Sequence, residues 1–242
     1  MKHTLCIFII LLFSAFTNAQ ITLQHKQSDR IVVFSNSKLK LTLNYNKKCV
    51  IEEMEINGEK VLSNESGIYS GIKLNTEVHS TQQLSTSPTV NIGKNKVVVS
   101  NIIYGKSDNP IAECWTFDVS NTDIKLEIDR KIKIPLLVEE VCFPAVTFKK
   151  FSTWDGAFLE FGGLAWFYLF NMVPSSYAVH SKSSTLWNQH TGNGLTVSVS
   201  STQNQIVSKF SRLKSDELEY AFTVSDNDVK YRYDENTNRR RF

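Results

Sequence analysis

The chain has 242 residues, of which 27 are Lys or Arg and 24 are Asp or Glu, so its formal net charge is +3. Basic and acidic residues are interspersed along the sequence, which excludes the basic surface that nucleic-acid binding needs. Hydrophobic residues make up 41% of the chain, enough to build a substantial core.

The first residues have the pattern of a secretory signal peptide. Lys2 and His3 precede an apolar run from Leu5 to Phe13, and residues 17–19 close the segment. We expect cleavage after Ala19, and removing 19 of the 242 residues leaves 223. The apolar run is shorter than the roughly 20 residues that cross a bilayer as a helix. The sequence therefore predicts a secreted or periplasmic protein with no membrane segment after cleavage.

Alternation of apolar and polar residues dominates the rest of the chain and predicts an all-β fold. No apolar stripe with helical spacing is long enough for a substantial helix. Turn-forming residues separate the alternating runs at short intervals, which is typical of a large antiparallel β-sandwich. The clearest runs are Leu39–Leu43, Ile124–Ile128, Ile132–Ile134 and Leu195–Val199.

The strongest turn signal is Asn57-Gly58, because both residues tolerate the positive φ of a type I′ hairpin. It predicts that Ile51–Ile56 pairs with Lys60–Leu62. The polar stretch Ser80–Pro88 is predicted to be a long surface loop.

No sharp change in composition divides the chain, so we interpret residues 20–235 as one β-sandwich domain. Residues 236–242 have too few apolar side chains to pack and are interpreted as a polar tail. Three cysteines remain after cleavage, and at most one internal disulfide is possible. Each lies among apolar neighbours, which favours a small buried side chain: Cys49, Cys114 and Cys142.

Two parts of the sequence resemble carbohydrate-handling proteins. Arg30–Leu43, followed by Ile51–Leu62, resembles the first strands of the supersandwich in galactose mutarotase-like proteins. Cys114–Val119, a turn and Ile124–Arg130 resemble paired long strands in the N-terminal sandwiches of bacterial glycoside hydrolases with an α/α-toroid catalytic domain. The resemblance implies an accessory or N-terminal domain, or a fragment, because the chain has no room for the toroid. The implied partner is a helical catalytic domain or protein.

Residues 154–170 are unusually rich in aromatic side chains and glycines. Aromatic rings stack on the apolar faces of sugars while carboxylates bond their hydroxyl groups, so this stretch suits a carbohydrate ligand. We predict that Trp154, Asp155, Glu160 and Trp166 bind the sugar. The alternative is a pair of core strands whose aromatic side chains pack between the sheets.

Residues 187–194 combine one tryptophan with polar residues and glycines, and we predict a loop. Trp187 is a stacking candidate here, with Asn188 and His190 as donors and acceptors for sugar hydroxyls. The alternative is that Trp187 folds back to cap the sandwich.

An enzymatic function would need an acid and a base that face one cleft. Mutarotases use a histidine as acid and a carboxylate as base, so the resemblance implies such a pair. The candidates are His180 and His190 as acid, and Glu160, Glu217 and Glu219 as base.

Paired carboxylates would be needed for glycoside hydrolysis, and Asp155 with Glu160 is the candidate pair. Glu52-Glu53 and Glu139-Glu140 are adjacent in extended segments, so we predict that their side chains point to opposite faces. The sequence has no metal-ligand or nucleophile motif, and no metal or cofactor is implied.

The leading hypothesis is a secreted carbohydrate-binding β-sandwich. The alternative from the enzyme class is a sugar epimerase or hydrolase with a His/Glu acid-base pair. A third hypothesis is a structural module that docks to a separate catalytic protein through the aromatic stretch.

Overall fold

The computed structural model describes residues 21–63, 66–74, 77–134, 140–150, 154–159, 162–165, 175–188, 191–198, 206–214 and 216–224. Every regular element in these ranges is a β-strand, so the predicted all-β class is confirmed. Within the same ranges, no helix is long and apolar enough to cross a membrane. The predicted signal peptide and polar tail lie outside the described residues.

The strands follow one another closely along the chain. They are β1 (Thr22–Lys26), β2 (Ile31–Ser35), β3 (Leu39–Asn44), β4 (Val50–Ile56), β5 (Glu59–Lys60), β6 (Ile68–Leu74), β7 (Glu77–Ser80), β8 (Thr89–Ile92), β9 (Lys96–Lys106), β10 (Asn109–Val119), β11 (Ile124–Ile132), β12 (Glu140–Phe148), β13 (Gly156–Leu159), β14 (Gly162–Ala165), β15 (Ser175–His180), β16 (Ser183–Trp187), β17 (Gly194–Ser198), β18 (Ile206–Arg212) and β19 (Leu218–Val224).

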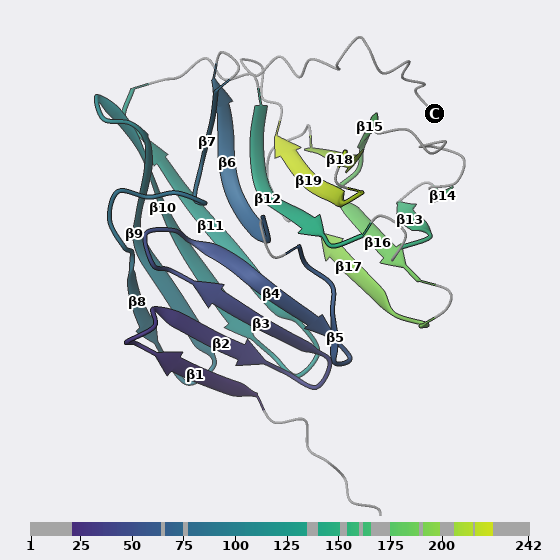
Figure 1. Cartoon of the computed structure of the whole chain (residues 1–242), viewed down its shortest axis with the longest axis horizontal. Coiled ribbons are helices and arrows are strands. Elements are labelled where there is room, and N and C mark those ends of the chain that lie inside the picture. Colours follow the sequence, from purple (N-terminus) through teal and green to yellow (C-terminus); the bar gives the residue numbers. More distant parts are fainter. Residues whose placement is uncertain are drawn as a thin grey trace, which may run out of the picture.

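The strands form three antiparallel sheets (Figure 1). Sheet A has 11 strands in the order β1-β2-β3-β4-β6-β12-β19-β18-β15, with β5 on β4 and β7 on β6. Sheet B has the order β11-β10-β9-β8, and sheet C has the order β14-β13-β16-β17. Figure 1 shows β8–β11 passing behind β1–β4, while β13, β16 and β17 lie toward the other end of sheet A. The result is a sandwich of antiparallel sheets.

One core connects all three sheets. Phe34 of sheet A contacts Phe117 of sheet B, with ring centroids 4.8 Å apart. Ala157 and Leu186 of sheet C belong to the same cluster of buried side chains. Each large apolar side chain that is fully buried contributes about 1.5–3 kcal/mol through the removal of its surface from water. The two small sheets are therefore held by packing against sheet A.

The Asn57-Gly58 hairpin is present between β4 and β5. The φ angles are 50° at Asn57 and 85° at Gly58, so both residues adopt the left-handed backbone of a type I′ turn. The second strand differs slightly from the prediction, because Leu62 leaves the hairpin and forms a bridge with Phe148. The predicted pairing of the two long runs is also confirmed, since β10 pairs with β11 in register from Val119–Ile124 onward.

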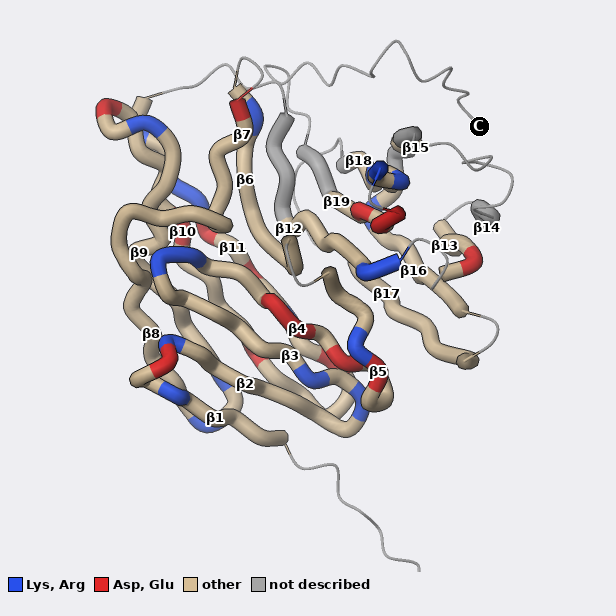
Figure 2. The backbone as a smooth tube through the Cα atoms, in the orientation of Figure 1, with Lys and Arg blue, Asp and Glu red and all other residues tan. Residues whose placement is uncertain are grey.

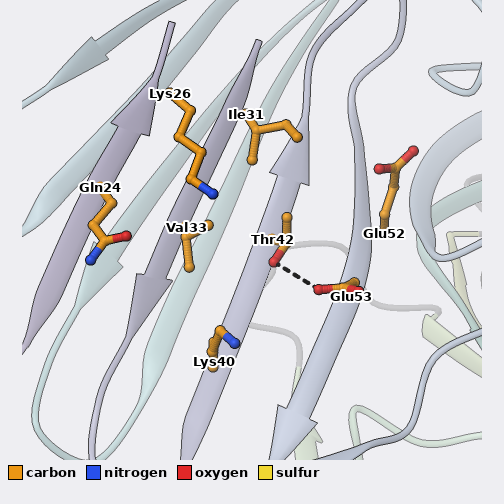
Figure 3. A pocket seen from close by; sticks show the side chains of 8 residues that line it. All are labelled: Gln24, Lys26, Ile31, Val33, Lys40, Thr42, Glu52 and Glu53. Carbon is orange, nitrogen blue, oxygen red and sulfur yellow. Dashed lines mark hydrogen bonds between the residues drawn. The ribbon is translucent and has the colours of Figure 1, made fainter. Parts of the chain in front are cut away.

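The prediction that Glu52 and Glu53 point to opposite faces is wrong. A β-bulge interrupts the pairing of β3 with β4, so that Thr42 pairs with Glu53 while Leu43 pairs with Ile51. A bulge inserts one extra residue and resets the alternation of side chains. Both carboxylates consequently lie on the outer face of sheet A, where they line the same groove (Figure 3).

The prediction that the cysteines are small buried side chains is confirmed for Cys49. Cys49 is buried and free, and burial raises the pKa of its thiol well above the ordinary value. Cys114 is half-buried and free. The side chain of Cys142 is outside the described part of the chain.

Candidate functional site

The described part of the aromatic stretch contains β13 and β14, which pair at one edge of sheet C. β13 also pairs with β16, which places Gly156 opposite Trp187 and Phe158 opposite Thr185. Alternation along β13 turns Ala157 into the core and Phe158 outward, where 55% of the Phe158 surface is exposed. The Phe158 ring therefore lies at the surface of a central strand of sheet C.

Phe158 and Trp187 form a stacked pair on the outer face of sheet C. Their ring centroids are 4.4 Å apart and the rings are inclined by 29°. Gly163 lies beside Phe158, and a Cβ atom at this position would come within 3.3 Å of the ring. The absence of a side chain at Gly163 therefore lets the Phe158 ring lie against the sheet.

Two hydroxyl groups lie on the same face as the stacked rings. The hydroxyl oxygens of Thr185 and Thr196 are 2.9 Å apart across β16 and β17. We call this surface the aromatic face, and it consists of Phe158, Gly163, Thr185, Trp187 and Thr196.

The aromatic face belongs to uncharged strands. None of the sequences of β13, β14, β16 and β17 contains Asp, Glu, Lys or Arg. Figure 2 shows the contrast between β16 and β17, which are drawn as uncharged, and β3–β5, where blue and red segments alternate. The face therefore offers rings and hydroxyl groups without a fixed charge on its strands.

Trp154 lies in the core and not on the aromatic face. Only 2% of its surface is exposed, and its ring packs edge-on against Phe148 at 5.2 Å. Its indole nitrogen is buried without a hydrogen-bond partner among the described residues. Asp155 follows at the surface, half-buried, and its backbone N–H donates to the carbonyl of Trp187 at 2.9 Å. The structure thus brings Asp155 and Trp187 together and assigns Trp154 a packing role.

Asn188 organises the loop that follows Trp187. Its side-chain oxygen accepts from the N–H of Thr191 at 3.1 Å, and its backbone N–H donates to the carbonyl of Asn193 at 3.0 Å. Such an Asx-type contact fixes a tight loop. The predicted sugar-bonding residue therefore holds the end of β16 in place beside the aromatic face.

Several predicted site residues lie outside the described part of the chain, namely Glu160, Trp166 and His190. His180 ends β15, but its side chain is also outside the described part. The predictions for these four residues stay predictions.

Of the two remaining glutamate candidates, Glu219 belongs to β19 of sheet A and Glu217 directly precedes that strand. The hydroxyl of Tyr69 donates to Glu219 at 3.2 Å, and the hydroxyl of Ser63 donates to Glu217. Glu219 pairs in register with Thr147 of β12 and Ser211 of β18. Both carboxylates therefore accept hydrogen bonds from side chains at sheet A, whereas Trp187 ends β16 of sheet C and Asn188 follows it.

A groove of about 540 Å³ crosses the outer face of β1–β4 (Figure 3). Ile31 and Val33 form part of its lining, and charged or polar side chains surround them. The complete lining is Gln24, Lys26, Ile31, Val33, Lys40, Thr42, Glu52 and Glu53. No pattern in the sequence indicated this groove, because the groove depends on the bulge in β4.

The carboxylates of the groove are paired with lysines. Lys60 donates to Glu53 at 2.6 Å, and this hydrogen bond lowers the pKa of Glu53. Lys48 donates to Glu52, and Lys40 lies 2.9 Å from Glu55. A general acid at neutral pH needs a raised pKa, which is the opposite of what Lys60 does to Glu53. The pairing suits ligand contact better than acid-base catalysis.

One buried carboxylate was missed by the sequence analysis. Glu113 is only 3% exposed, yet it accepts hydrogen bonds from the Arg130 guanidinium at 2.6 Å and from Trp115 at 2.8 Å. Tyr104 donates at 2.7 Å and Ser70 at 2.9 Å. The signal was present in the sequence, because Glu113 occupies an inward position in the alternation of β10. With its oxygens engaged by four residues, this carboxylate serves the structure of the core.

No group of three or more His, Cys, Asp or Glu side chains in the described ranges could hold a metal ion. The fold and the exposed site together define an antiparallel β-sandwich with a surface of rings and hydroxyl groups. No protein-family model matches the chain, and no curated protein matches it.

Proposed function

We propose that the protein is an exported carbohydrate-binding β-sandwich that holds a neutral glycan on the aromatic face of sheet C. The observation that carries this proposal is the stacked pair of Phe158 and Trp187, which reaches the surface although most of the other aromatic rings in the described residues are buried. Sugar rings present apolar C–H faces that pack on aromatic rings.

The neighbouring groups supply the polar part of recognition. Thr185 and Thr196 carry hydroxyl groups that both donate and accept, so they match sugar hydroxyls in either direction. The strands of sheet C carry no charge. An anionic sugar would therefore lose hydration without gaining an ion pair on these strands, which favours a neutral glycan.

The stacked rings reduce the entropic cost of binding. Phe158 and Trp187 restrain each other, and the backbone contact between Asp155 and Trp187 fixes the end of β16. Side chains that are already ordered lose little freedom when the ligand binds. This preorganisation supports a binding surface over a loosely packed patch.

The resemblance noted in the sequence extends the proposal to a wider context. A galactose mutarotase-like supersandwich would act as an accessory or N-terminal domain of a glycoside hydrolase, in the periplasm or outside the cell. Its role there would be to position the glycan for a helical catalytic domain.

The proposal is tested on a glycan array with the chain from residue 20 to 242. We expect the wild type to bind neutral glycans and Trp187→Ala to lose at least about tenfold in affinity, which corresponds to 1.4 kcal/mol. Val78→Ala is the matched control, because Val78 is an exposed apolar residue on β7 of sheet A. Circular dichroism checks that all variants are folded. Equal binding by Trp187→Ala and wild type, or no binding by wild type, would overturn the proposal.

A further inference from the structure

In the described part of the chain, each of the two small sheets ends in a strand with one unpaired edge. Among the described strands, β11 is the terminal strand of sheet B and pairs with β10 alone, whereas β17 is the terminal strand of sheet C and pairs with β16 alone. A slot of about 610 Å³ lies between these strands. Side chains of sheet A, among them Met54, Ile68 and Val146, close its base.

The slot has an apolar interior and a polar rim. Its apolar lining consists of Leu39, Leu41, Ile51, Met54, Ile56, Ile68, Phe117, Ile124, Leu126, Pro144, Val146, Leu195 and Val197. The polar side chains that line it come from the surface turns and from β17, and include Lys38, Asn57 and Asp123.

The lining residues of β17 show how this strand faces the slot. All five of its consecutive residues, Gly194–Ser198, contact the slot. Successive side chains of a strand point to opposite faces, so a cavity beneath one face would touch alternate residues only. The slot therefore runs along the outer edge of β17, where the backbone N–H and C=O groups have no neighbouring strand among the described residues.

The apolar interior of the slot and the unpaired edge of β17 together determine which kind of ligand fits. An alkyl chain would fill the apolar base but would leave the backbone groups of the β17 edge against hydrocarbon, which costs free energy for each unpaired group. An extended peptide satisfies both surfaces, because its backbone pairs with the free edge while alternate side chains enter the slot.

The walls of the slot are anchored before anything binds. The side-chain amide of Asn57 donates to Asn193 at 2.7 Å, and Asn193 donates to Glu59 at 3.2 Å, which ties the loop before β17 to the β4–β5 hairpin. On the side of β11, the Asn36 amide donates to the Ser120 carbonyl at 3.1 Å. Anchored walls lower the ordering cost of a bound strand.

The rim adds a charge preference. The Lys38 ammonium makes no ion pair within the described part of the chain, and Asp123 on the facing turn accepts from Thr122 at 3.2 Å. We propose that the slot between β11 and β17 binds an extended peptide strand of a partner protein, with apolar side chains at alternate positions and an acidic side chain beside Lys38. The slot shares Thr196 with the aromatic face, but the stacked rings of Phe158 and Trp187 do not line it.

The test begins with selection of binders from a phage-displayed library of random octapeptides, followed by titration of the enriched synthetic peptides. We expect enriched peptides with apolar residues at every second position. Leu126→Asp places a charge in the slot and should weaken binding at least about tenfold. Lys125→Asp is the matched control, because the preceding side chain points to solvent and should leave the affinity unchanged.

Hydrogen exchange locates the bound peptide without relying on a core variant. Amides of Gly194–Ser198 should gain protection on binding, because strand addition pairs the free edge of β17. Lys38→Glu changes an exposed side chain and should shift the selected peptides from acidic to basic residues at that end. Failure to enrich any peptide, protection elsewhere, or saturable binding of dodecanoate without protection of residues 194–198 would overturn the proposal.

Discussion

Among single residues in the described structure, Glu113 carries the most deeply buried carboxylate. It lies among apolar neighbours in β10, where an isolated charge would be costly, and the Arg130 guanidinium compensates it at 2.6 Å. Removing one member of such a pair leaves the other buried and unpaired. The position was readable in the sequence as a polar residue on an apolar face, but Arg130 as its neighbour follows only from the β10–β11 register.

Arg130→Met should destabilise the fold by about 3–5 kcal/mol, because Glu113 would remain buried without its cation. Urea unfolding measures the change. Lys131→Met is the control, since this neighbouring side chain is exposed and should have little effect. If Arg130→Met unfolded at the same urea concentration as the wild type, the ion pair would not be needed for the stability of the fold.

Glu53 gives a prediction for acid pH. The hydrogen bond from Lys60 lowers the pKa of Glu53 from its ordinary value of 4.5. The folded state therefore holds this proton more weakly, so the ion pair stabilises the fold above that value and the contribution is lost as the pH falls through the lowered pKa. Wild type should lose more stability than Glu53→Gln when the pH falls from about 7 to about 3. If wild type and Glu53→Gln lost the same amount of stability over this pH range, the prediction would be contradicted.

At the scale of elements, turns with a backbone requirement were the most predictable features. Asn57-Gly58 specified its hairpin because few other residue pairs accept positive φ at both positions. The bulge in β4 had no comparable signal, since Glu52 and Glu53 look like an ordinary pair of polar residues. Which of them interrupts the ladder depends on the pairing with β3.

Gly58→Ala should destabilise the fold by about 1–2 kcal/mol, because alanine is strained at a φ of 85° while its Cβ would meet no other atom within 4 Å. The loss would thus be purely conformational. Gly93→Ala is the matched control: its φ is not positive and its nearest contact would be an ordinary 3.7 Å. Thermal unfolding that ranks the two variants equally would contradict the turn assignment.

At the scale of the whole molecule, composition could not separate binding from packing in residues 154–170. Trp154 and Trp187 were both reasonable stacking residues, since a tryptophan suits either environment. Their roles diverge because β13 pairs with β16, which directs Trp187 outward, whereas Trp154 precedes β13 and fills the core beside Phe148. The slot between sheets B and C could not be predicted from the sequence either, because it is formed by strands that are far apart in the sequence.

Alanine substitution should separate the two tryptophans. Trp154→Ala removes a buried ring and should cost about 3–5 kcal/mol of folding stability. Trp187→Ala removes a half-buried ring and should cost much less, while it removes glycan binding. Chemical unfolding of both variants measures the difference, and a larger loss for Trp187→Ala would contradict the assignment of these two residues.

The most direct test of the aromatic face follows the indole N–H resonances of the protein by NMR during titration with a neutral glycan selected on the array. Trp115 and Trp154 are buried, whereas Trp187 belongs to the exposed stacked pair. We expect the Trp187 resonance to move in a saturable way while those of Trp115 and Trp154 stay in place. A bound glycan that leaves Trp187 unmoved would contradict it.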